Sequence, residues 1–267
     1  KGLYLFLYNS CFYFILISIR TIISVNYTVE EFGYFTFSFT IANAVMLLLD
    51  SFNTILFPKT IDLMSSDDNK KKADALEKMR VGYILTSHML VYLAMICFPI
   101  LVWFIPKYMP ALSSMNMIAL AVLMNTNSYG YSNMLIAQNK EHKAGFISAV
   151  SLIVNIILGL GLAKILNVEY SYITIAILVA YMISSFLMAY EGDTILRREK
   201  SVSYTLKHFF PIRMFIPYMI ALIISCTQIE YLIFIPLLVF IMLNYKDLQF
   251  LKNIALKLIK EPEVIDV

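Results

Sequence analysis

A row of polar side chains interrupts an otherwise apolar stretch, residues 31–58. The spacing of four, three, seven and four residues would place all five members on one side of a helix: Thr36, Thr40, Asn43, Asp50 and Thr54. A polar group left in hydrocarbon costs free energy, so this side should face a protein interior or a water-filled cavity. Asp50 could carry a coupling sodium ion or a proton, or it could make a structural hydrogen bond near the membrane interface.

The first apolar span, residues 3–25, carries a second row of this kind: Asn9, Tyr13, Arg20 and Ser24. An arginine near the bilayer centre costs about 2.5–3.5 kcal/mol, so Arg20 snorkels outward, pairs with a carboxylate or faces a polar cavity. In a cavity its guanidinium would suit an anion, because the planar fork bonds two phosphate oxygens at once. Asp50 should lie roughly 15 Å away in depth, and we expect the two charges to act separately.

A third polar group lies at the centre of the fourth apolar span, residues 111–137, where the sequence reads NTNSYGYSN. Within it Asn125, Tyr129 and Asn133 recur every four residues and would share one helix face. We expect these side chains to contact hydroxyl groups of a cargo, or to make hydrogen bonds between helices.

The composition indicates a membrane protein. Of the 267 residues 60% are hydrophobic and 15% are charged, and the mean hydropathy is +0.75, whereas soluble domains are about 45–50% apolar and about 25% charged. We expect an all-α polytopic membrane protein, because several windows are long enough to cross a bilayer. The expected parts are a lobe of six transmembrane helices, an amphipathic cytoplasmic connector, an additional transmembrane hairpin and an interfacial cytoplasmic tail: residues 1–190, 191–210, 211–245 and 246–267.

Three local features predict helix geometry. The second span is expected to stop at Pro58, because proline disrupts a helix interior. The fourth span, residues 111–137, is expected to be one continuous span. In the fifth span, Asn155, Gly159 and Ala163 form a ridge of small residues that is typical of close packing between helices.

The distribution of charge predicts an orientation. If the first span begins in the cytoplasm, the cytoplasmic ends and loops hold every lysine and arginine except Arg20, Lys107 and Lys164. This asymmetry follows the positive-inside rule and places both termini in the cytoplasm. The first residue is Lys1, and we expect these residues to be the later part of a longer chain.

Catalysis is not favoured by the sequence. The expected external loops are short, and no HExxH, GxSxG, Walker A or GxGxxG motif lies in a suitable context. Cys11, Cys97 and Cys226 lie in separate apolar spans without CxxC spacing, so they indicate neither a disulfide framework nor a metal site. We expect no enzyme, cofactor or nucleic-acid partner. Helices with polar faces and short loops are typical of a transporter or channel lumen.

Four short patterns appear in order along the chain. They are E-F-G-Y after the first span, N-x-x-x-F-P at Asn53–Pro58, P-x-Y at Pro106–Tyr108, and N-x-x-x-A-Q-N-K at the end of the fourth span. Over roughly residues 1–190 the chain thereby resembles the second half of a polysaccharide flippase, of the O-antigen type, in the MATE-like (multidrug/oligosaccharidyl-lipid/polysaccharide) superfamily.

The resemblance implies two six-helix lobes in a V around a central cavity, which carry an undecaprenyl-diphosphate-linked oligosaccharide across the bacterial inner membrane for surface polysaccharide synthesis. It maps the cavity lining onto Arg20, Asn9, Asn43 and Asp50. Only one lobe and the extra hairpin are present, whereas alternating access needs two bundles that move against each other. The expected partners are therefore the lipid-linked oligosaccharide, membrane lipids, and a missing N-terminal lobe or second subunit.

Three other functions compete with this one. A MATE-type exporter of cations or drugs, driven by sodium or protons, would favour acidic and aromatic cavity groups over Arg20. A glycan polymerase or ligase would usually need a substantial charged external loop, which this chain does not offer. A scaffold protein would need no polar stripe along its second span.

Overall fold

The computed structural model describes residues 2–65, 69–197 and 201–249, and every regular element assigned in these residues is helical. The α-helices are α1 (Gly2–Asn26), α2 (Val29–Ser65), α3 (Asn69–Phe104), α4 (Leu112–Thr126), α5 (Tyr131–Ala137), α6 (Glu141–Leu160), α7 (Thr174–Arg197), α8 (Val202–Phe209), α9 (Ile212–Thr227) and α10 (Ile235–Leu243). Four short 3₁₀ or π segments join them: η1 (Pro106–Ala111), η2 (Gly161–Ile165), η3 (Tyr170–Ile173) and η4 (Glu230–Leu232).

Among the described residues, 6 helical segments are long and apolar enough to cross a membrane. A seventh is formed if α8 and α9, which meet at an angle of 67°, count as one bent span. The chain is thus an all-α, multi-pass membrane protein, as the composition predicted. The expected hairpin corresponds to α9 and α10, which pack against each other. Its second arm, Glu230–Leu243, is shorter than a full crossing. Of the expected tail, residues 250–267 lie outside the described part of the chain.

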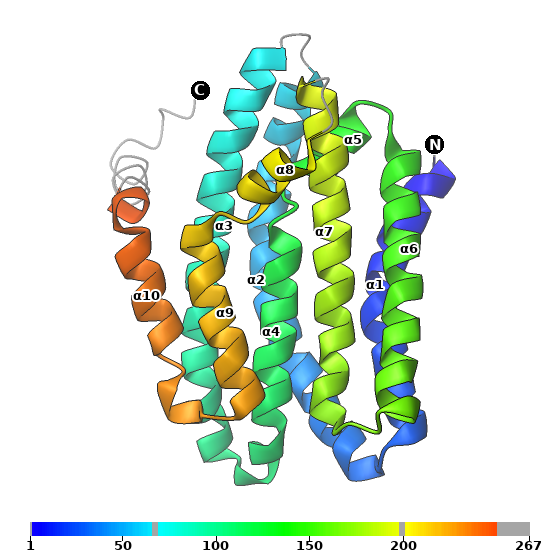
Figure 1. Cartoon of the computed structure of the whole chain (residues 1–267), viewed down its shortest axis with the longest axis vertical. Helices are drawn as coiled ribbons and strands as arrows, with labels where there is room; N and C mark the ends of the chain where they lie inside the picture. Colours follow the sequence, from blue (N-terminus) through cyan, green and yellow to red (C-terminus); the bar gives the residue numbers. More distant parts are fainter. Residues whose placement is uncertain (1, 66–68, 198–200, 250–267) are drawn as a thin grey trace.

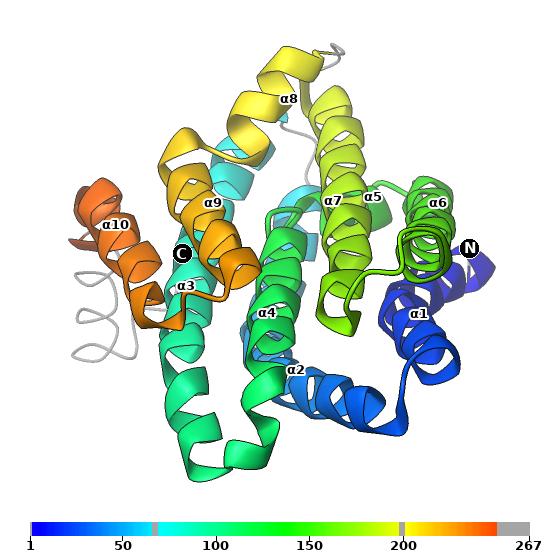
Figure 2. The same cartoon turned by 60° about the horizontal axis from the view of Figure 1, so that its bottom comes forward.

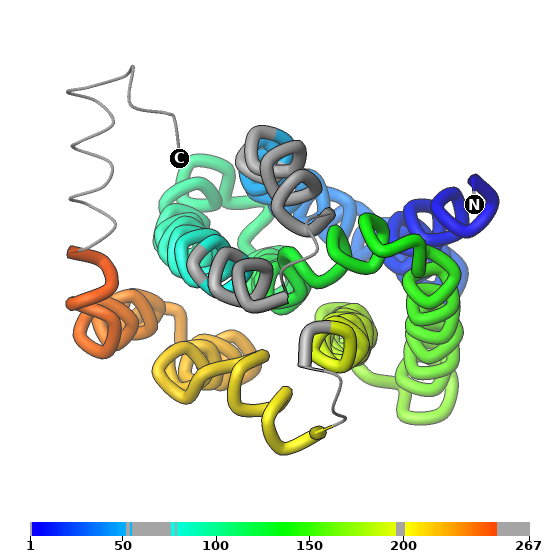
Figure 3. The backbone as a smooth tube through the Cα atoms, turned by 90° about the horizontal axis from the view of Figure 1, so that it is seen from above, coloured from blue at the N-terminus to red at the C-terminus, as the bar shows by residue number. Residues whose placement is uncertain are grey.

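The bundle is organised around α4, which packs against α2, α3, α7 and α9. In the side view, α1 and α6 form one edge of the bundle and α10 forms the other (Figure 1). The view from above shows the same order, with the orange α10 and the green α6 at opposite ends (Figure 3). Most of α4 is buried, since 14 of its 15 residues lie inside the protein. A helix this buried supplies the core of the lobe.

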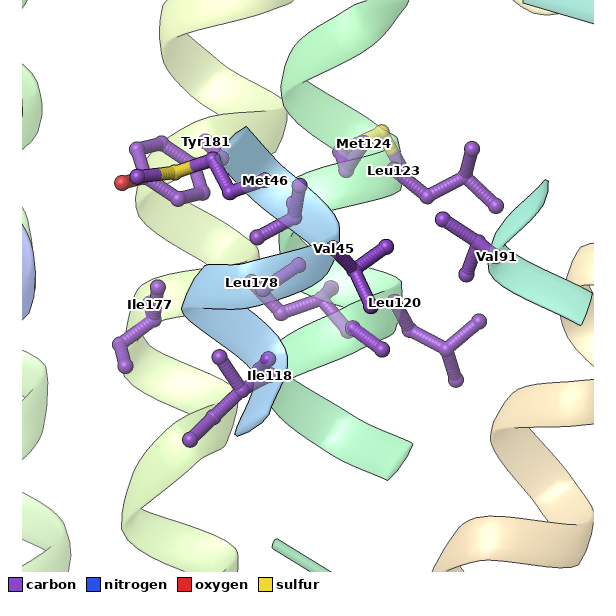
Figure 4. Packing of buried hydrophobic residues seen from close by; sticks show 14 of the residues in the cluster. Val45, Met46, Val91, Ile118, Leu120, Leu123, Met124, Ile177, Leu178 and Tyr181 are labelled. Atoms are coloured by element: carbon purple, nitrogen blue, oxygen red, sulfur yellow. The ribbon is translucent and has the colours of Figure 1, made fainter. Parts of the chain in front are cut away.

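Apolar side chains from four helices meet around α4. Val45 of α2, Val91 of α3 and Leu178 of α7 lie near Leu120 of α4 in the core (Figure 4). A few polar contacts cross this core; in one of them the Ser38 hydroxyl lies 2.6 Å from that of Ser114. Packing of this kind, with isolated hydrogen bonds between helices, holds membrane bundles together.

The small-residue ridge of the fifth span packs closely against α1, as predicted. Asn155 of α6 donates a hydrogen bond to the carbonyl oxygen of Ile15 at 2.9 Å and a second to the Ser18 hydroxyl at 2.9 Å. A Cβ atom added at Gly159 would lie 2.7 Å from the Ile19 Cδ1 atom. Glycine at this position therefore lets the two helices pack closely without displacing the Ile19 and Ile22 side chains.

Two features of helix continuity differ from the expectations. The helix α2 does not end at Pro58 but continues to Ser65, although its part that is long and apolar enough to cross a membrane is Val29–Ser51. The fourth span is not continuous but ends as α4 at Thr126 and resumes as α5 at Tyr131. In addition, α7 extends past residue 190, the expected end of the lobe, to Arg197.

Candidate functional site

A polar pocket of about 320 Å³ lies between α1, α2, α3 and the break from α4 to α5. Most of its wall consists of hydroxyl, amide and phenol groups, with one carboxylate and a few apolar side chains: Leu5, Tyr8, Asn9, Asp50, Tyr83, Asn125, Thr126, Ser128, Tyr129, Ser132, Asn133 and Ile136. Asp50 and Asn9 are exposed, so the pocket reaches the surface of the bundle. We call it the polar pocket.

Residues from all three rows of the sequence meet in this pocket. They are the candidates Asn9, Asp50, Asn125, Tyr129 and Asn133. Three separate parts of the chain therefore converge on one place, which the spacing within each helix could not establish.

The other three candidates lie elsewhere. Arg20 is eleven residues beyond Asn9 on α1, or about 16 Å along the helix at 1.5 Å per residue, and its guanidinium lies 5.5 Å from the centre of the Phe32 ring. Tyr13 is exposed one turn beyond Asn9, and Asn43 is half-buried on α2, about 10 Å along the helix from Asp50. As expected, Arg20 and Asp50 are well separated.

An aromatic pair forms part of the pocket wall. The rings of Tyr83 and Tyr129 are stacked, with their centres 4.0 Å apart and an interplanar angle of 21°. Tyr83 also donates a hydrogen bond to the carbonyl oxygen of Leu49, one residue before Asp50, at 3.4 Å. The pair joins α3 to the α4–α5 break and presents flat apolar surface beside polar groups.

Several pocket residues were missed by the sequence analysis. Thr126, Ser128 and Ser132 belong to the segment NTNSYGYSN, whose high polarity was the available signal. Tyr8 neighbours Asn9 in the sequence. Tyr83 lies alone in the first turn of an apolar span, and no spacing pattern points to it.

The α4–α5 break follows from the residues that form it. Gly130 has a φ of 81°, a backbone conformation that costs little only for glycine. The Ser128 hydroxyl donates to the carbonyl oxygen of Asn125 at 2.9 Å, so a side chain replaces a helical hydrogen bond. Arg80 donates to the carbonyl oxygen of Asn127 at 3.0 Å, where the free carbonyl groups of a helix end attract a cation.

A buried polar network supports the break from behind. The Arg80 guanidinium donates to the Tyr131 hydroxyl at 2.7 Å, and this hydroxyl donates to an oxygen of Asp193 at 3.0 Å. The other Asp193 oxygen accepts a hydrogen bond from Thr205 of α8 at 2.9 Å. The network links α3, α5, α7 and α8. The sequence analysis counted Arg80 among the charges of the cytoplasmic ends and loops and placed Asp193 in the cytoplasmic connector, yet their exposed fractions are only 2% and 6%.

Most members of the polar rows of α1 and α2 are accessible on the surface of the bundle. Asn9, Tyr13, Arg20 and Ser24 of α1 are all exposed, as are Thr40, Asp50 and Thr54 of α2, while Thr36 and Asn43 are half-buried. The two helices pack against each other, so their rows belong to neighbouring surfaces. We call this the wet face. It is not covered by the described part of the chain, and in a membrane such groups require water or another protein beside them.

The groups that line the polar pocket are suited to binding a ligand through hydrogen bonds and stacking. Its amides and hydroxyls both donate and accept hydrogen bonds, and its tyrosine pair offers a stacking surface. Among the described residues that line it, Asp50 alone carries a charge. Among the described residues, no group of three or more histidine, cysteine or acidic side chains could hold a metal ion.

The comparisons with known proteins return no relatives. No family model, no curated protein and no solved structure matches the chain.

Proposed function

We propose that this chain is one lobe of a transporter that moves a lipid-linked oligosaccharide, joined to its lipid by a diphosphate, across the bacterial inner membrane. The observation that carries the proposal is the polar pocket, which opens on the wet face of α1 and α2. A polar cavity between membrane helices, on a face that another lobe could close, is the arrangement that alternating access requires.

The chemistry of the pocket suits a sugar. Asn9, Asn125 and Asn133 supply amide groups that can donate to and accept from sugar hydroxyls, and the tyrosine pair supplies a flat surface for a sugar ring. These groups make the pocket polar and give it a single charge. Such a pocket suits a neutral, hydroxyl-rich cargo. The lipid part of the cargo would remain in the bilayer beside the wet face.

Arg20 would bind the diphosphate on the same face. It is exposed on α1, about 16 Å along the helix from the sugar pocket, so an extended cargo would contact both. A charge-assisted hydrogen bond from its guanidinium is worth about 1.5–3 kcal/mol. In a cell with a negative interior, outward movement of each negative charge gains about 2.3 kcal/mol per 100 mV.

The arrangement of the chain also supports an orientation. The start of α1, the facing ends of α2 and α3, α5 and α8 lie at one end of the bundle, and the α3–α4 and α6–α7 connections lie at the other (Figure 1). Since the basic residues concentrate at the first end, we propose that this end is cytoplasmic.

The test is the fate of lipid-linked intermediates in the native host. After deletion of the parent gene, an oligosaccharide on a lipid diphosphate should accumulate in the cytoplasmic leaflet. The wild-type gene should clear it, whereas Arg20→Ala and Asn125→Ala at matched expression should not. Ser51→Ala is the control, because Ser51 is exposed next to Asp50 but does not line the pocket. Normal clearance by both variants would contradict the proposal.

A cation exporter is the second candidate, and one observation favours it. The pocket contains the carboxylate of Asp50 and three tyrosines, whereas Arg20 lies outside it. An acidic and aromatic site suits a cationic cargo. Efflux of a cationic dye that is lost in Asp50→Asn and kept in Arg20→Ala, without accumulated lipid intermediates, would assign this function instead.

A further inference from the structure

A second pocket lies on a different part of the bundle, beside the bend between α8 and α9. It has a volume of about 320 Å³, and apolar side chains of α4, α7, α8 and α9 line it, including Met182, Phe186, Phe209 and Phe215. Figure 2 shows how α8 leaves the end of α7 and turns into α9. We call this the apolar pocket. Its size and lining are typical of a site for an apolar ligand.

A shallower pocket of about 490 Å³ adjoins the apolar pocket and adds positive charge. The two share Leu206, Phe210 and Phe215. The shallower pocket also reaches Lys207, in the last turn of α8, and Arg213, in the first turn of α9, and both are exposed. Arg213 donates to Asp247 at 2.7 Å, but 52% of its side-chain surface is still accessible.

Together the two pockets have a charged end and an apolar end, as a phospholipid molecule has. Arg213 lies where the apolar helix α9 begins, which is the depth of lipid headgroups. From there the apolar pocket extends along α7 from Phe186 to Met182. Met182 is one helical turn further from Asp193 than Phe186 is, so this end of the pocket lies deeper in the hydrocarbon region. A ligand that fills both must have an acidic head and an apolar tail.

We propose that the apolar and shallower pockets together bind one acidic phospholipid, with its phosphate at Lys207 and Arg213 and an acyl chain in the apolar pocket. A protein helix fits less well as the occupant. An α-helix is about 10–12 Å across with its side chains, and a helix with an apolar face would not by itself supply the acidic group that suits Lys207 and Arg213. An acyl chain is narrow enough to enter, and the two cations favour an acidic headgroup over a zwitterionic one.

The test is lipid binding to the full-length parent protein, delipidated in detergent and followed by native mass spectrometry. Dioleoyl phosphatidylglycerol should bind saturably and more tightly than dioleoyl phosphatidylcholine. Lys207→Ala and Arg213→Ala should each weaken the phosphatidylglycerol complex about fivefold. Lys164→Ala should leave it unchanged, because this exposed lysine is at the other end of the bundle.

Asp247→Ala separates lipid binding from a structural role of the ion pair. Both Arg213→Ala and Asp247→Ala remove the Arg213–Asp247 bridge, but only the first removes the cation. Asp247→Ala should therefore keep or strengthen phosphatidylglycerol binding. Equal weakening by the two variants would overturn the proposed headgroup site.

Met182→Trp tests the acyl chain, because Met182 lines the apolar pocket and is 41% exposed, so a larger side chain there can fill the pocket without burial in the core. Binding should fall, whereas Ile157→Trp on the exposed face of α6 should have no effect. Unchanged binding in Met182→Trp would overturn the acyl-chain assignment. Competition by soluble glycerol phosphate as effective as that by the lipid would show a free-phosphate site and overturn the proposal.

Discussion

Arg80 is a positive charge buried inside the bundle, and the groups around it stabilise that charge. Its guanidinium donates to a phenol and to a helix-end carbonyl, and it lies 4.2 Å from the centre of the Tyr131 ring. The Asp193 carboxylate accepts a hydrogen bond from the same phenol. Planar and permanently charged, arginine can satisfy both acceptors at once, which lysine cannot.

We predict that Arg80→Met destabilises the protein by about 1–3 kcal/mol, because it leaves the Tyr131 hydroxyl and the Asn127 carbonyl oxygen without their buried hydrogen-bond donor. Arg80→Lys should recover only part of the loss, since an ammonium group cannot reproduce the fork. Thermal unfolding of the purified protein in detergent measures both. Arg20→Ala is the control and should change stability by less than about 0.5 kcal/mol, because Arg20 is exposed. An equal effect of the two arginines would show that the network contributes little.

Gly130 is a second single residue on which the shape of the polar pocket depends. A residue with a side chain at position 130 would have to adopt the same positive φ, and its Cβ atom would collide with the Leu76 side chain. We predict that Gly130→Ala costs at least about 1 kcal/mol of stability and weakens cargo clearance, because it moves the wall of the polar pocket.

Gly33→Ala is the matched control for Gly130. Gly33 lies inside α2, and nothing is within 4 Å of its added Cβ atom. Alanine should stabilise this helix by about 0.5–1 kcal/mol. If both substitutions stabilise the protein, the positive φ at the break is not required.

At the scale of elements, sequence patterns predicted what depends on local periodicity. The close α1–α6 contact follows from the spacing of Asn155, Gly159 and Ala163, since small side chains on one face leave room for a neighbour. The α4–α5 break was not predicted. Its polar centre was recognised, but Gly130 acts together with Leu76 and Arg80, which are distant in the sequence.

We predict that Gly159→Val destabilises the α1–α6 pair by about 1–3 kcal/mol, because its branched side chain would overlap Ile19 and Ile22. Ile19→Ala should be less harmful in the Gly159→Val background than alone, because it makes room for the valine. A double-mutant cycle of thermal stabilities measures this coupling. Additive effects would mean that the valine is accommodated elsewhere.

At the scale of the whole molecule, the wet face was only half predictable. The rows on α1 and α2 follow from helical spacing, and so does the expectation that they avoid lipid. Which rows would meet in one pocket depends on how four helices pack. For that reason Asn9, Asp50 and Asn125 meet in the polar pocket while Arg20, on the same face of α1 as Asn9, does not.

We predict that the wet face contacts water in the membrane-embedded protein. Single cysteines at Asn9, Ser24 and Thr40 should react with a membrane-impermeant, water-soluble thiol reagent, because thiolate formation requires water. Cysteines at Ile153 and Ile157, exposed apolar positions of α6, should stay unlabelled in the lipid.

The background for this experiment lacks Cys11, Cys97 and Cys226, of which Cys97 is exposed. Slow labelling along α1 and α2, equal to that of Ile153 and Ile157, would mean that protein covers the wet face tightly. In that case the polar rows would form a static interface rather than the lining of a transport cavity, since a cavity for a polar cargo must admit water during the transport cycle.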